Sequence, residues 1–107
     1  MKKSRLRLHA GVSILQVEWT RPALADLIEA QSYIARENPH AAQLIGERIW
    51  RASQSLGAHP YSGREGHVDS TREWVVQRTP YLIVYRVHND RVEILHVYHG
   101  KQNWQDQ

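Results

Sequence analysis

The chain has 107 residues, no cysteine and a formal net charge of +3, with 41% hydrophobic and 23% charged residues. This length supports one small domain with a single core, and the composition is that of an ordinary globular protein rather than a disordered or membrane-spanning one. The absence of cysteine excludes a disulfide framework and a thiolate zinc site, and a cytoplasmic location is the default expectation.

The excess positive charge lies at the N-terminus, on Lys2, Lys3, Arg5 and Arg7. By contrast, residues 20–57 carry four basic and four acidic side chains, and residues 58–107 carry six of each. We therefore expect residues 1–13 to form a basic arm, disordered or in contact with phosphates, and residues 14–107 to form the domain. No apolar segment follows these charges, so a signal peptide is not expected.

The first half of the chain predicts one strand and two helices. Residues 14–19 alternate enough for a strand, and Thr20 followed by Arg21-Pro22 indicates a helix N-cap. Apolar residues then recur at helical spacing until about Glu37. Asn38-Pro39 ends this helix and starts a second one, which Gly57 terminates.

Three short runs rich in Val, Ile, Tyr and Trp predict three consecutive strands, at residues 72–78, 81–87 and 91–99. A two-residue turn at Asn89-Asp90 then sets a register. Its facing pairs are Arg86 with Glu93, Val84 with Leu95, Leu82 with Val97, Tyr85 with Ile94, Ile83 with His96 and Tyr81 with Tyr98. This register predicts that the helices cover an apolar patch formed by Leu82, Val84, Leu95 and Val97.

The expected fold is therefore α+β, in the order β-α-α-β-β-β, with an antiparallel helical hairpin packed on one face of a small, mainly antiparallel sheet. The other face is expected to stay partly open. The apolar stripes of the helices are most simply core.

Motifs for metal or nucleotide binding are not expected. The long loop at residues 57–71 contains Gly63 and Gly66 but lacks the Gly-Lys-Ser/Thr ending of a phosphate-binding P-loop. His96 and His99 are three residues apart in a strand, so they point to opposite faces, and no Asp, Glu or Cys completes a zinc pattern. We expect no metal and no other cofactor.

The last third of the chain carries residue types that suit RNA. Cleavage of RNA without metal needs a base, an acid and fixed positive charge, while aromatic rings hold unstacked bases. The candidates are Arg72, Arg78, Tyr98, His99, Lys101 and Trp104. The alternative is an ordinary sheet surface or a protein interface, with Arg86 paired to Glu93.

Three runs carry a resemblance to a known family. They are Gly63-Arg64-x-Gly66-His67-Val68-x-x-Thr71-Arg72-Glu73-x-Val75, Pro80-Tyr81-x-Ile83-Val84-Tyr85-Arg86-Val87 and Val92-Glu93-Ile94-Leu95-x-Val97-x-His99-Gly100-x-Gln102-x-Trp104. Over roughly residues 14–104, this combination resembles the RelE/ParE superfamily of toxins, nearest its RelE/StbE plasmid-stabilisation branch.

The resemblance implies the toxin of a type II toxin–antitoxin module, neutralised by a cognate antitoxin that also takes the complex to operator DNA. RelE-like members cut ribosome-bound mRNA without metal, whereas ParE-like members poison DNA gyrase and are not nucleases. We expect mRNA cleavage first, with gyrase inhibition as the alternative. A non-toxic protein-binding module is a third hypothesis.

The resemblance also implies roles for residues. In a RelE-like mechanism, the catalytic residues would be His99, Arg72 and Arg78, and the substrate-binding residues would be Arg64, Lys101, Tyr98 and Trp104. The chain departs from the nuclease pattern at Leu82 and Gly100, where arginine is frequent, and at Trp104, where tyrosine is frequent.

Overall fold

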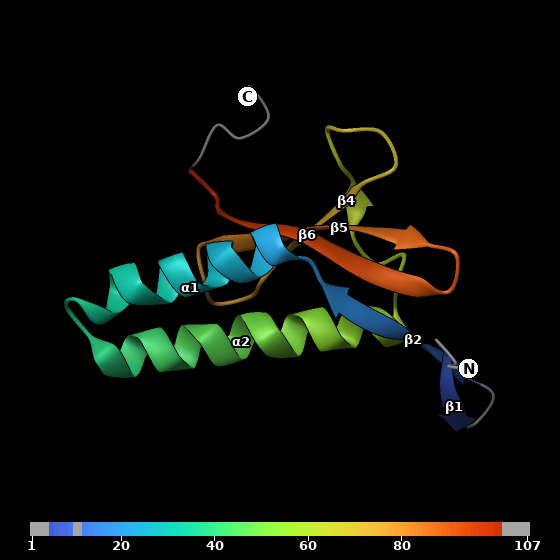
Figure 1. Cartoon of the computed structure of the whole chain (residues 1–107), viewed down its shortest axis with the longest axis horizontal. Helices are drawn as coiled ribbons and strands as arrows, with labels where there is room; N and C mark the ends of the chain where they lie inside the picture. Colours follow the sequence, from blue (N-terminus) through green and yellow to red (C-terminus); the bar gives the residue numbers. More distant parts are fainter. Residues whose placement is uncertain (1–4, 10–11, 102–107) are drawn as a thin grey trace.

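The computed structural model describes residues 5–9 and 12–101, in which two helices pack on one face of a single sheet (Figure 1). The elements are β1 (Arg5–His9), β2 (Val12–Trp19), α1 (Arg21–Ala35), α2 (Pro39–Ala58), β3 (Arg64–Glu65), β4 (Arg72–Val75), β5 (Tyr81–His88) and β6 (Arg91–His99). The strand order is β1-β2-β6-β5-β4-β3. Only β2 and β6 are parallel among these strands. The predicted α+β fold is confirmed.

The structure adds two short strands to the predicted set. β1 lies within the basic arm and pairs with β2, so residues 5–9 extend the sheet. β3 lies within the long loop and pairs with β4. The division of the chain into an arm and a domain at residue 13 stays a prediction.

Side-chain caps begin both helices at the predicted residues. The Thr20 hydroxyl accepts a hydrogen bond from the amide of Ala23, and the Asn38 side chain accepts one from the amide of Ala41. Each cap satisfies an amide that has no partner inside its helix. Neither of the two helices is both long and apolar enough to cross a lipid bilayer.

The core lies between the helical hairpin and the sheet. Its cluster of buried residues is Ala23, Ile49, Leu56, Val76, Tyr81, Ile83, Tyr85, Val92, Ile94 and Val97. Leu82 and Val84 are also buried but belong to the opposite face. The predicted assignment of faces is therefore wrong for β5. Tyr81, Ile83 and Tyr85 face the helices, and Leu82 and Val84 do not.

The predicted register between β5 and β6 is right near the turn and wrong beyond it. Arg86 lies opposite Glu93 as expected, but the pairing shifts by one residue past Tyr85, so that Val84 faces His96 and Ile83 faces Val97. A bulge at this point leaves Leu95 without a facing partner, and it turns Val97 toward the core. The face of every following β6 residue is reversed.

The bulge coincides with a change in the neighbour of β6. β2 pairs with β6 only as far as Ile94. There the Thr20 amide and hydroxyl donate to the Ile94 carbonyl at 3.1 and 2.8 Å, and the chain turns into α1. On this edge, the rest of β6 therefore lies beside α1, while its other edge stays paired with β5.

Gly57 lets the end of α2 approach the backbone of β2. A Cβ atom at this position would lie 2.6 Å from the Leu15 carbonyl oxygen and 3.1 Å from a Val17 methyl group. We expect Gly57→Ala to lower the free energy of unfolding by about 1–3 kcal/mol, because the helix must move away from the strand. Urea denaturation would measure the change. Ser55→Ala, at an exposed position of the same turn, is the control, and an equal loss in both would contradict this explanation.

Candidate functional site

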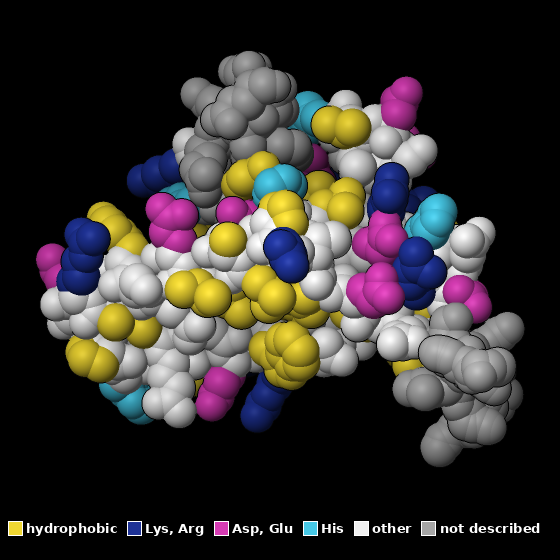
Figure 2. Space-filling view, in the orientation of Figure 1, with side chains coloured by type: hydrophobic (Ala, Val, Ile, Leu, Met, Phe, Trp, Pro, Cys, Tyr) yellow, Lys and Arg dark blue, Asp and Glu magenta, His cyan; other side chains and the backbone are white. Residues whose placement is uncertain are grey.

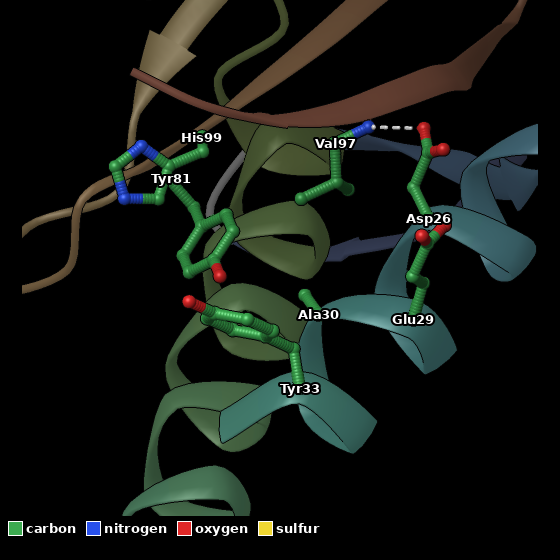
Figure 3. Close-up of a pocket in the computed structure, with 7 residues that line it drawn as sticks. All are labelled: Asp26, Glu29, Ala30, Tyr33, Tyr81, Val97 and His99. Atoms are coloured by element: carbon green, nitrogen blue, oxygen red, sulfur yellow. Dashed lines mark hydrogen bonds between the residues drawn. The ribbon is translucent and has the colours of Figure 1, made fainter. Parts of the chain in front are cut away.

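His99 lies at the end of β6, on the face of the sheet that α1 covers. It pairs with Tyr81 across the strands, and the two rings meet edge to face with centroids 5.3 Å apart. The surrounding pocket of about 410 Å³ is lined by Asp26, Glu29, Ala30, Tyr33, Tyr81, Val97 and His99 (Figure 3). We refer to it as the His99 pocket.

The ring of His99 is oriented by the turn that follows it. The backbone amide of Lys101 donates a hydrogen bond to Nδ1 of His99 at 3.1 Å. Because Nδ1 accepts this bond, a neutral His99 carries its proton on Nε2. The nitrogen with which His99 could donate or exchange a proton is therefore Nε2.

Two tyrosines occupy the pocket beside His99. Figure 3 shows Tyr81 and Tyr33 next to each other, with their hydroxyl groups at the same end. Burial, followed by the nearby Tyr33, raises the pKa of Tyr81 above its usual value of 10.0. Tyr81 is consequently a neutral hydrogen-bonding group at neutral pH, not a base.

The opposite wall of the pocket is acidic. Asp26 and Glu29 project from successive turns of α1 (Figure 3). One carboxylate oxygen of Asp26 accepts the Val97 amide at 3.0 Å and lies 2.9 Å from Nδ1 of His96. Asp26 thus satisfies the edge of β6 that β2 has left, and Glu29 adds a second negative charge at the rim.

Arg72, the second predicted catalytic residue, stabilises the segment that follows α2. Its guanidinium donates to the Gly63 carbonyl at 2.7 Å and lies over the Tyr61 ring, 5.0 Å from the centroid. Beside it, the buried Tyr85 hydroxyl accepts the Gly63 amide at 2.9 Å and donates to the Pro60 carbonyl at 2.8 Å. Arg72 therefore stands among loop groups and not in the His99 pocket.

Arg78, the third predicted catalytic residue, lies in the turn between β4 and β5. It lines a different pocket, together with side chains of α2. The linings of the pockets that hold His99, Arg72 and Arg78 share no residue. Each of the three therefore lines a different one of these pockets.

The predicted substrate-binding residues are also dispersed. Tyr98 neighbours His99 in β6 and so points to the opposite face, where its ring stacks on His96 at 4.9 Å. Lys101 is exposed in the turn after β6, and Trp104 lies outside the described residues. Arg64 is in β3, where both of its guanidinium contacts go to one carboxylate.

That carboxylate belongs to Glu73, whose side chain is almost completely buried. Arg64 donates to Oε1 at 2.9 and 3.1 Å, and Nδ1 of His67 lies 3.1 Å from Oε2. Burial alone would raise the pKa of Glu73, but the hydrogen bonds from His67 and Arg64 outweigh it and hold the pKa below its usual 4.5. The predicted loop arginine thus stabilises the sheet through a buried anion.

Sequence reasoning missed the residues of α1 that face His99. Asp26, Glu29 and Tyr33 recur at intervals of three and four, which places them on one side of a helix. That polar stripe was the available signal. In the described part of the chain, no three His, Cys, Asp or Glu side chains are grouped so as to hold a metal ion.

Glutamine in place of Glu73 is expected to reduce the acid sensitivity of folding. Because folding lowers the pKa of this carboxyl, the anion adds stability above its usual pKa of 4.5, and the contribution disappears as the pH falls through the folded-state value. Urea titrations at about pH 7 and about pH 3 should therefore show a smaller fall in the free energy of unfolding for Glu73→Gln than for the wild type.

Glu47→Gln is the matched control, since it removes the same charge from an exposed position of α2. It should leave the contribution of Glu73 in place. Equal falls in the Glu73→Gln protein and the wild type would contradict the role assigned to the buried carboxylate.

The chain is similar to known proteins over most of its length. Residues 17–104 match the family described as ParE toxin of type II toxin-antitoxin system, parDE. The chain is 44% identical over 89 residues to Y4kP of Sinorhizobium fredii (strain NBRC 101917 / NGR234), covering 83% of this chain and 92% of that protein. It is 40% identical over 85 residues to Toxin RelE2 of Caulobacter vibrioides, covering 79% and 94%.

A solved structure, described as the chromosomal ParDE TA system from P. aeruginosa, has the same fold. It superimposes with a TM-score of 0.70 at 27% sequence identity, covering 78% of this chain and 92% of the solved one. The fold, the family match and the relatives therefore agree.

Proposed function

The chain belongs to the ParE toxin family of type II toxin–antitoxin systems, within the RelE/ParE superfamily, and from this premise we propose that it inhibits DNA gyrase by binding and is not a nuclease. As the toxin of such a system, it has a cognate antitoxin as partner. The observation that carries the proposal is that His99 and the two arginines that RNA cleavage would need beside it line three different pockets of the described residues.

Electrostatics supports the same function. A nuclease site must hold a phosphate next to its proton-transfer group and stabilise the charge that develops on it. The His99 pocket instead presents the carboxylates of Asp26 and Glu29, which repel phosphate. It suits a neutral or cationic group of a protein better than an RNA backbone.

Cleavage of ribosome-bound mRNA is the second candidate. It is favoured by the 40% identity to a protein named Toxin RelE2 and by the Nε2 atom of His99, which the hydrogen bond from Lys101 leaves as the proton-carrying nitrogen. In this mechanism His99 transfers the proton, while Arg72 and Arg78 stabilise the phosphate. Those arginines would have to reach one phosphate from separate pockets.

The two functions differ in what is damaged in the cell. Expression without the antitoxin should arrest growth, and the purified protein should inhibit supercoiling by gyrase in vitro. Primer extension on cellular mRNA should show no new ends within translated codons. Codon-specific cuts together with unchanged supercoiling would reject gyrase inhibition in favour of mRNA cleavage.

His99→Gln tests whether proton transfer matters. Glutamine retains an acceptor for the Lys101 amide but cannot act as an acid or base at neutral pH. We expect growth arrest and supercoiling inhibition to stay within about 3-fold of the wild type, whereas loss of general acid–base catalysis would lower a nuclease rate about 100-fold or more. His88→Gln, at the exposed end of β5, is the matched control.

A further inference from the structure

A second pocket, on the α2 side of the molecule, gathers positive charge. Arg48 and Arg51 from α2 and Arg78 from the turn after β4 surround about 330 Å³ of space, with Ala52, Trp74 and Val76 as its main apolar lining. Arg48 and Arg51 are three residues apart and so share one helix face. We call this the arginine pocket.

The three guanidinium groups have no anionic partner among the described residues. Arg48 is half-buried, yet its hydrogen bond goes to a neutral acceptor, the Arg78 carbonyl, at 3.2 Å. No described carboxylate lies within 4.0 Å of Arg48, Arg51 or Arg78. Arg48 is therefore a partly buried cation without the compensation that such groups usually have, and the exposed Arg51 and Arg78 add two further positive charges beside it.

Three arginines of the sheet are paired with carboxylates. Arg64 pairs with Glu73 at 2.9 Å and Arg86 with Glu93 at 2.7 Å. Arg91 lies between two carboxylates, at 3.0 Å from Glu18 and 3.2 Å from Glu93. These three arginines are thus neutralised, whereas the arginines of the pocket have no carboxylate partner among the described residues.

The backbone of Arg78 is held in a conformation that favours glycine. Its φ is 64°, and the turn is closed by the Thr79 amide and hydroxyl, which both donate to the Val76 carbonyl. Residues other than glycine, asparagine and aspartate are uncommon at such a φ. Residues with a strained backbone concentrate at functional sites. An arginine therefore occupies a position that glycine would fit more easily.

We propose that the arginine pocket binds paired acidic side chains on a segment of the antitoxin that also carries an apolar residue. Guanidinium groups bind carboxylates through two parallel hydrogen bonds, and three of them can hold two carboxylates. Ala52, Val76 and the half-buried Trp74 supply contact for the apolar neighbour. The inference concerns the antitoxin and does not depend on which target the toxin has.

A nucleic acid fits this surface less well. Affinity for a nucleic-acid backbone grows with the number of phosphates neutralised along a track. Here three arginines line one pocket, and Arg64, Arg86 and Arg91 of the sheet are already paired with carboxylates. A local anion on a peptide, accompanied by apolar contact, matches this arrangement.

The test is fluorescence anisotropy with the full chain. The probe is a fluorescein-labelled peptide, Leu-Glu-Glu-Leu-Leu-Glu-Glu-Leu, and a labelled twelve-nucleotide single-stranded DNA represents the competing class. We expect Arg48→Gln/Arg51→Gln to bind the peptide at least about 10-fold more weakly than the wild type does. Arg21→Gln/Arg36→Gln, which removes the same charge from exposed positions of α1 and its C-cap, should stay within about 2-fold.

Arg78→Gly separates binding from folding. Because glycine suits a φ of 64°, the melting temperature of the Arg78→Gly protein should equal or exceed that of the wild type. The affinity of this variant for the peptide should fall about 5-fold or more. Equal losses in the two double variants, full affinity in Arg78→Gly, or no measurable binding by the wild type would overturn the proposal. If Arg48→Gln/Arg51→Gln lowers the affinity for the DNA more than the affinity for the peptide, the proposal is overturned in favour of a phosphate-bearing ligand.

Discussion

Strand β6 pairs with β2 only as far as Ile94, while its pairing with β5 continues to His99. Beyond Ile94, another element must supply hydrogen bonds to the edge that β2 has left. Thr20 and Asp26 supply the hydrogen bonds, the first to the Ile94 carbonyl and the second from the Val97 amide. Because buried backbone groups need partners, this requirement fixes where α1 starts and how closely it approaches the sheet. It also places His99 against α1, so the geometry of the candidate site follows from the unpaired edge.

The helical hairpin separates two electrostatic environments. The α1 side carries Asp26 and Glu29 around His99, and the α2 side carries Arg48 and Arg51, which have no anionic partner in the described part of the chain. Figure 2 shows basic, acidic and apolar groups interspersed over the helices and the adjoining sheet on one face of the molecule. A partner that contacts both sides of the hairpin must therefore present groups of opposite sign at separate points, which ties its orientation to the sequence of charges along it.

Local signals in the sequence predicted the fold well, and long-range contacts explain the errors. Thr20 and Asn38 cap their helices through neighbouring amides, and the Asn89-Asp90 turn fixes the pair Arg86–Glu93. The bulge at Leu95 depends on α1, about 70 residues earlier in the chain, so turn geometry could not reveal it. The buried face of β5 was not predictable from alternation, since all five residues of 81–85 are buried.

The site was predicted less well, because the type of a residue does not specify which pocket or which face of the sheet its side chain points to. Arg72 and Arg78 are close in sequence yet line different pockets, and Tyr98 and His99 are adjacent yet lie on opposite faces.

The parallel pairing of β2 with β6 has a consequence for how the protein is made. β2 can pair with β6 only after residues 91–94 have been synthesised. Such long-range pairing slows folding, so the sheet of a nascent toxin stays incomplete until β6 emerges from the ribosome.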